Sequence, residues 1–173
     1  ALSACGTGYY AALVGRYYFE RYARIACDLD VASEFRYRES PLNGIDLALF
    51  ISQSGETADT LASLRYAKSQ GVRAAAIVNV PESTIAREAD VVWPTLAGPE
   101  IGVASTKAFT CQLTALAALA IRAGVARGVI DAAQELELTR QLMEVPRLVN
   151  EALALEPEIE LFGHEPVSYT HLR

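Results

Sequence analysis

Short apolar runs alternate with longer segments of helical periodicity along most of this chain. The apolar runs lack a regular alternation of apolar and polar residues, which is typical of strands that are covered on both faces of a sheet. We therefore predict a three-layer α/β fold, in which a five-stranded parallel sheet is flanked by helices. The strands are expected at residues 1–5, 27–32, 47–51, 74–78 and 91–93.

The segments between these runs predict the helices and the limits of the domain. Helices are expected at residues 9–24, 57–70 and 105–123, with at most one turn at 85–88. The 105–123 segment is apolar on all sides, so we expect it to be buried against the sheet or a partner. We assign residues 1–128 to one domain, 129–162 to a connecting helical segment and 163–173 to a tail of uncertain origin. Pro146 predicts a kink or a break in the connecting helix.

The composition argues against several classes of protein. The formal charge of −6 over 173 residues disfavours an extended nucleic-acid surface. Cys5, Cys27 and Cys111 form no CxxC pair, and His164 and His171 lie far from them, so no metal site or disulfide framework is expected. The sequence shows no signal-peptide pattern and no run of 18 apolar residues, so we expect a cytoplasmic protein without a membrane partner.

Three turns carry the chemistry that can be inferred from the residues. Ligands of parallel α/β sheets bind beyond the carboxyl ends of the strands, where helix starts expose free N–H groups. The turns expected at that edge are residues 5–9, 52–57 and 102–107. The middle turn places the hydroxyls of Ser52, Ser54 and Thr57 at a helix start, and Gly55 lets the backbone close on an oxygen. This pattern predicts an uncharged cradle for a phosphate group.

Two other interpretations apply to the same turns. Ser, Thr and Gly at a helix start also cap helices, although the three turns together favour an anion site. The run from Gly6 to Ala11 fits the G-x-G-x-x-A pattern of dinucleotide-binding domains, with Asp28 or Asp30 about twenty residues further on. A dinucleotide-binding domain is therefore the alternative from the residues alone. We interpret the carboxylates of Glu56 and Glu100 as capping or solvated groups rather than as bases.

Three longer motifs resemble those of a known enzyme family. They are ASEFRYR at 32–38, SQSGETADT at 52–60 and EIGVASTKAFT at 100–110. In order and spacing they are similar to motifs of glutamine:fructose-6-phosphate aminotransferase, from about residue 1 to residue 161. The resemblance implies that the fold is that of a sugar isomerase (SIS) domain, the first of two in that enzyme. A stand-alone SIS domain that senses a phosphosugar is the alternative.

The resemblance also implies an activity and a set of partners. The enzyme family converts fructose 6-phosphate and glutamine into glucosamine 6-phosphate and glutamate, with no metal or organic cofactor. This chain would work with a glutaminase domain and a second SIS domain of the same polypeptide, and we expect a homodimer. The catalytic lysine, glutamate and histidine of the family belong to the second SIS domain and the C-terminal tail. We therefore assign no catalytic residue here, Lys107 included, and predict that the fragment alone is inactive.

The resemblance assigns the substrate-binding residues by motif. Those expected at the phosphate are Ser52, Gln53, Ser54 and Thr57, and those expected around the sugar are Thr7, Val103 and Ser105. At the position after Cys-Gly-Thr the family commonly has serine or alanine, whereas this chain has Gly8. A hydroxyl contact from that position is therefore lost.

Overall fold

The computed structural model describes residues 1–101 and 105–164. The chain divides into two compact units, residues 1–135 and 136–173. The first unit holds the whole sheet, and the second holds most of one helix and all of another.

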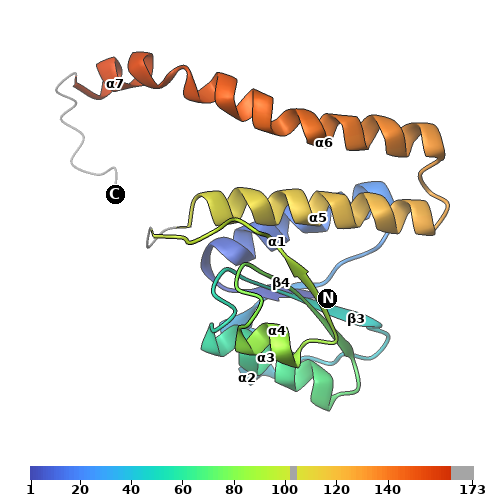
Figure 1. The fold of residues 1–173 in the computed structure, drawn as a ribbon. Coiled ribbons are helices and arrows are strands. Elements are labelled where there is room, and N and C mark those ends of the chain that lie inside the picture. Colours follow the sequence, from blue (N-terminus) through green and yellow to red (C-terminus); the bar gives the residue numbers. More distant parts are fainter. Residues whose placement is uncertain (102–104, 165–173) are drawn as a thin grey trace. The chain divides into compact units, whose positions relative to one another are not determined.

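A five-stranded parallel sheet forms the centre of the first unit (Figure 1). Its strands are β1 (Leu2–Ala4), β2 (Leu29–Val31), β3 (Leu47–Ser52), β4 (Arg73–Val78) and β5 (Val91–Pro94). The order across the sheet is β2-β1-β3-β4-β5, and every neighbouring pair is parallel. The predicted fold class is confirmed, and each strand lies within two residues of its expected position.

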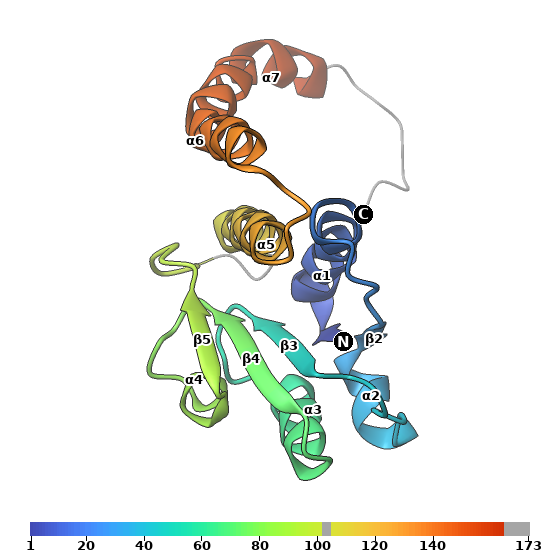
Figure 2. The ribbon, with the colours of Figure 1, turned by 90° about the vertical axis from the view of Figure 1, so that its right-hand side faces the viewer.

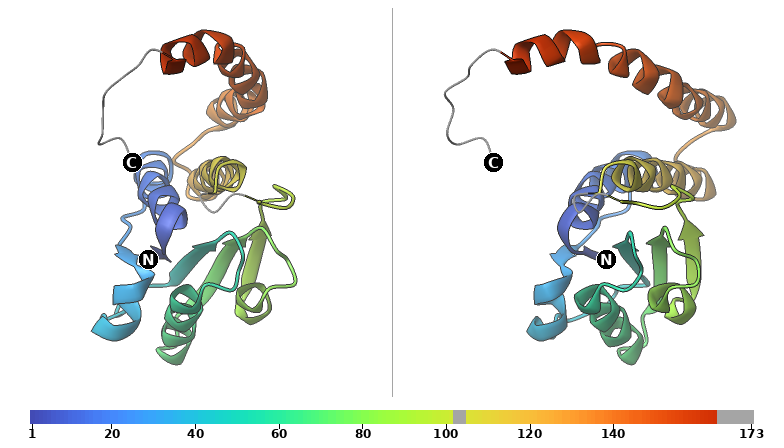
Figure 3. Two further views of the ribbon diagram at one scale, coloured as in Figure 1. Left: turned by 90° about the vertical axis from the view of Figure 1, so that its left-hand side faces the viewer. Right: turned by 60° about the vertical axis from the view of Figure 1, so that its left-hand side comes forward.

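Helices cover both faces of the sheet, which gives the three predicted layers (Figures 2 and 3). One face carries α1 (Gly6–Tyr18), which continues as the π-helical turn η1 (Phe19–Ala23), and α5 (Lys107–Ala126). The other face carries α2 (Ala32–Arg38), α3 (Ala58–Ser69) and α4 (Thr84–Glu88). The side chains of β3 alternate between the two cores, with Ile51 on the α1 side and Phe50 on the α3 side.

Helix α5 is long and apolar enough to cross a membrane by length and composition. A core helix passes the same test, and α5 packs against α1 and η1. Ala108, Leu116 and Ala120 on its inner face are fully buried. The expectation that this apolar segment is buried is therefore confirmed for one face of the helix.

The connecting segment is helical, as expected. Helix α6 (Ala132–Leu153) begins with reciprocal bonds, in which the Gln134 amide donates to Asp131 Oδ1 and the Asp131 amide donates to Gln134 Oε1. The helix continues through Pro146, so of the two predicted alternatives, a kink or a break, the break does not occur. A second helix, α7 (Glu156–His164), follows.

The strand order places a crevice between β1 and β3. The connection from β1 leads to β2 on one side, whereas the connection from β3 leads to β4 on the other. The two crossovers leave in opposite directions, so they leave an opening at the carboxyl ends of β1 and β3. In open α/β sheets this is the position where ligands bind.

Candidate functional site

A cavity of about 410 Å³ lies at this crevice. It is lined by Cys5, Gly6, Thr7, Gly8, Ile51, Ser52, Gln53, Ser54, Thr57 and Ser105. The cavity brings together residues of all three predicted turns. Six of the seven predicted binding residues line it, and the seventh, Val103, lies outside the described residues.

The turn from β3 to α3 is folded around the side chain of Ser52. This side chain is only 4% exposed, and its Oγ accepts a hydrogen bond from the Gly55 amide at 3.0 Å. The same Oγ lies 3.0 Å from Thr57 Oγ1 in a second hydrogen bond. Ser54 Oγ accepts from the Glu56 amide at 3.2 Å. The Ser52 hydroxyl therefore shapes the turn, a role that the sequence alone did not reveal.

The geometry of this turn suits an oxyanion. The Ser52–Thr57 bond uses only one of the two hydroxyl protons, so the other is available to a ligand. The first amides of α3 have no partner within the helix, and the positive end of the helix dipole lies at the same place. Among the described residues, no lysine or arginine lines the cavity. The lining of the cavity therefore offers hydroxyls and main-chain amides to a ligand.

Helix α4 supports the turn from behind. The Ile85 amide donates to the Gly55 carbonyl at 3.0 Å, and the Thr84 amide donates to Glu56 Oε1 at 2.7 Å. This bond from the Thr84 amide lowers the pKa of Glu56 below its ordinary value of 4.5. Glu56 thus caps the start of α4, in agreement with its interpretation as a capping group.

Acid should weaken the link between the turn and α4. Because the folded-state pKa of Glu56 is lowered, its contribution to stability is complete above pH 4.5 and is lost as the pH falls through the lowered value. We expect Glu56→Gln to lower the urea midpoint of unfolding at pH 7, and to lower it much less at pH 3. Urea unfolding followed by circular dichroism at the two pH values measures this difference. An equal effect at both would show that the Glu56 charge contributes nothing to stability.

The turn from β1 to α1 forms the opposite wall of the cavity. Gly6 begins α1 with φ +54°, and Thr7 is half-buried in the first helical turn. Gly8 is buried, and a Cβ at this position would lie 3.0 Å from the Ile51 carbonyl oxygen. Helix α1 therefore approaches β3 closely at Gly8.

Ser105 reaches the cavity from the segment before α5. Upstream of it, Glu100 Oε2 accepts from the Ala108 amide at 3.1 Å, so its carboxylate caps α5 and favours the positive end of that helix. Glu100 is therefore a capping residue, as interpreted from the sequence. Lys107, the first residue of α5, is exposed and does not line the cavity.

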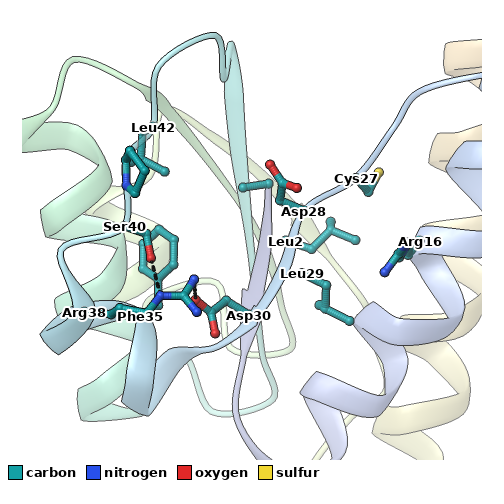
Figure 4. Close-up of a pocket in the computed structure, with 12 residues that line it drawn as sticks. Leu2, Arg16, Cys27, Asp28, Leu29, Asp30, Phe35, Arg38, Ser40 and Leu42 are labelled. Atoms are coloured by element: carbon teal, nitrogen blue, oxygen red, sulfur yellow. Dashed lines mark hydrogen bonds and ion pairs between the residues drawn. The ribbon is translucent and has the colours of Figure 1, made fainter.

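A second cavity, of about 370 Å³, lies beside the edge strand β2 (Figure 4). Two of its charged groups are paired with each other: Arg38 Nη2 lies 2.5 Å from Asp30 Oδ2, and Arg38 Nε also donates to Ser40 Oγ at 2.9 Å. Asp30, one of the two candidate ribose ligands of a dinucleotide-binding domain, is thus ion-paired inside β2. The strand order also differs from the 3-2-1-4-5-6 order of such domains. Both observations disfavour the dinucleotide alternative.

The described residues contain no group of three or more histidine, cysteine, aspartate or glutamate side chains that could hold a metal ion. All three cysteines are free. Burial raises the pKa of the Cys27 thiol, which keeps this residue in its protonated form at neutral pH.

Comparison with known proteins identifies the family of this chain. The SIS domain family matches residues 1–122. The chain belongs to the SIS domain family. Among solved structures, the C-terminal domain of glucosamine-fructose-6-phosphate aminotransferase from Francisella tularensis shows 44% identity and a TM-score of 0.89, over 93% of this chain and 46% of that one. Glucosamine-6-phosphate deaminase from Thermotoga maritima shows 27% identity and a TM-score of 0.67, over 80% and 42%.

Curated relatives extend the match beyond the SIS domain itself. The glutamine–fructose-6-phosphate aminotransferase of Mesorhizobium japonicum is 66% identical over 169 residues, which cover 98% of this chain. That of Brucella abortus is 61% identical over 171 residues. The resemblance inferred from the three motifs is therefore confirmed. This SIS domain chain spans only 28% of the length of either relative.

Proposed function

We propose that this chain is the first SIS domain of a glutamine–fructose-6-phosphate aminotransferase and that its cavity binds the phosphoryl end of fructose 6-phosphate. The observation that carries the proposal is the cavity lined by hydroxyls and amides at the switch point between β1 and β3. Its position, its donors and its lack of basic side chains suit a phosphomonoester held by neutral groups.

The residues divide into two groups. Ser52, Gln53, Ser54 and Thr57 form the phosphate wall, and Thr7 and Ser105 form the sugar wall. The resemblance also assigns Val103 to the sugar, but this residue lies outside the described residues. Within the first group, Ser52 acts mainly through the turn that it holds, because its oxygen already accepts from the Gly55 amide. The chain supplies binding, and the proton transfers and imine chemistry of the complete enzyme take place on residues of its other parts.

The partners follow from the same proposal. A glutaminase domain and a second SIS domain belong to the complete polypeptide, and we propose that it forms a homodimer in the cytoplasm. An outward apolar stripe on α1 supports an interface, because Tyr10 and Tyr17 are 61% and 63% exposed and are spaced seven residues apart on one helix face. The stand-alone sensor is the less favoured alternative, since the curated relatives described above are aminotransferases.

Calorimetric titration of the chain with fructose 6-phosphate tests the proposal. We expect saturable one-site binding, no binding of NAD, and an affinity about tenfold lower in Ser54→Ala, because a hydrogen bond to a charged oxygen contributes about 1.5–3 kcal/mol. Ser69→Ala is the matched control, since Ser69 lies at the far end of α3 and its hydroxyl donates to the Tyr66 carbonyl. Binding of NAD in place of the phosphosugar, or equal affinity in Ser54→Ala and the parent chain, would contradict the proposal.

A further inference from the structure

Asn79 joins the two loops that flank the cavity, although it does not line the cavity itself. It follows directly after β4, and its backbone amide donates to the Gln53 carbonyl at 3.1 Å. Its side chain bonds the loop after β5: Oδ1 accepts from Thr95 Oγ1 at 3.0 Å and from the Ala97 amide at 2.8 Å, and Nδ2 donates to the Gly98 carbonyl at 2.7 Å. One residue thus contacts both the phosphate turn and the loop that leads to Ser105.

The loop after β5 depends on these bonds for its shape. Its last bond to the sheet is the Thr95 amide to the Val78 carbonyl at 2.9 Å, and beyond it Leu96 and Gly98 both have positive φ, at 53° and 71°. A leucine in this conformation is strained, so surrounding contacts must hold it there. The side-chain amide of Asn79 supplies those contacts, because its Oδ1 accepts two hydrogen bonds and its Nδ2 donates one.

The same loop is fixed a second time before it reaches the cavity. Glu100 Oε2 accepts from the Ala108 amide, which ties the loop to the start of α5. Glu100 lies two residues beyond Gly98, the last residue bonded to the Asn79 side chain. In the sequence, Ser105 lies between Glu100 and Ala108, the two residues joined by this second bond.

We propose that Asn79 is a positioning residue, which sets the separation between the sugar wall and the phosphate wall of the cavity. This proposal rests on the proposed function of the cavity. Its main-chain bond to Gln53 is independent of the side chain, so it survives substitution. Removal of the side chain should release only the Ser105 wall and leave the phosphate turn in place.

The affinities for two ligands distinguish a positioning role of Asn79 from a general effect on folding. Inorganic phosphate engages only the turn at Ser52–Thr57, whereas fructose 6-phosphate spans both walls. Titrations of the chain followed by amide NMR signals give both affinities. For Asn79→Ala we expect fructose 6-phosphate to bind about 5- to 10-fold more weakly, because three hydrogen bonds to the loop are lost, while the affinity for phosphate stays within about twofold.

A milder variant and a control complete the experiment. Thr95→Val removes only the hydroxyl that donates to Asn79 Oδ1. We therefore expect fructose 6-phosphate to bind about two- to threefold more weakly, with the affinity for phosphate unchanged. If Asn79→Ala does not fold, this variant decides the question. Asn150→Ala, at an exposed position of α6, should change neither affinity.

Each remaining outcome overturns the proposal. An equal loss for both ligands would show that Asn79 contributes only to folding, and an unchanged affinity for fructose 6-phosphate would show that the loop position does not matter. If the parent chain binds neither ligand, the proposed function fails together with this inference. If the parent chain binds both and Asn79→Ala behaves like it, only this inference fails.

Discussion

Replacement of Gly55 by alanine should abolish measurable binding of fructose 6-phosphate and lower the free energy of unfolding by about 2–4 kcal/mol. Gly55 has φ +66°, a conformation that costs an alanine about 1–2 kcal/mol. An added Cβ would also lie 1.9 Å from Ser83 Oγ and 2.4 Å from Ser83 Cβ. Ser83 is 2% exposed, and no change of side-chain rotamer moves its Cβ, so the backbone of one of the two segments must shift.

Gly71→Ala is a control that separates the cost of a positive φ from the steric overlap with Ser83. Gly71 has φ +78° and no neighbouring atom within 4 Å of an added Cβ, and it lies after the carboxyl end of α3, away from the cavity. Chemical denaturation should show a smaller loss of stability for Gly71→Ala than for Gly55→Ala, and calorimetry should show normal ligand binding. A Gly55→Ala chain that binds fructose 6-phosphate normally would show that the turn does not form the phosphate site.

Replacement of Ser52 by alanine should weaken binding of fructose 6-phosphate by about 10- to 100-fold. The substitution removes the acceptor of the Gly55 amide and the hydrogen-bond partner of Thr57 Oγ1. The buried Gly55 amide would then lack a partner, which costs about 1–3 kcal/mol of stability. Calorimetric titration and urea unfolding of the variant measure the two effects.

Ser3→Ala is the matched control for this substitution. Ser3 is also a buried strand serine, at 2% exposed, but its Oγ has no hydrogen-bond partner in the described part of the chain. Its removal should leave binding unchanged and should not lower stability, because an unpaired buried hydroxyl contributes nothing. Equal losses in Ser3→Ala and Ser52→Ala would show that the hydrogen bonds of Ser52 do not hold the turn.

The sheet could be predicted because each strand has a pattern in its own residues. Apolar runs such as residues 74–78 are buried on both faces of the sheet, and such a run can be recognised without knowledge of the neighbouring strand. The binding edge was predicted for the same reason, since every turn after a parallel strand emerges at one edge. Helix α2 has no counterpart among the predicted helices, because its seven residues make fewer than two turns and bury only Ala32 and Phe35.

The features that the sequence did not reveal depend on distant residues. The Asn79 side chain contacts residues 16 to 19 positions away, and Glu56 accepts from an amide 28 positions away. The Ser52 hydroxyl bonds to Gly55 and Thr57 within the turn, and these bonds depend on how the turn folds back on itself. The number of hydroxyl residues in the turn does not predict them. For Pro146 the sequence left a kink and a break open, and α6 is continuous there, because one missing amide bond does not have to end a helix.

A crystal structure of the chain grown with fructose 6-phosphate tests the central claim most directly. It should show the phosphoryl oxygens accepting hydrogen bonds from the hydroxyls of Ser54 and Thr57 and from main-chain amides at the start of α3, with the sugar directed toward Thr7 and Ser105. A phosphoryl group bound instead by Arg38 in the cavity beside β2 would contradict it.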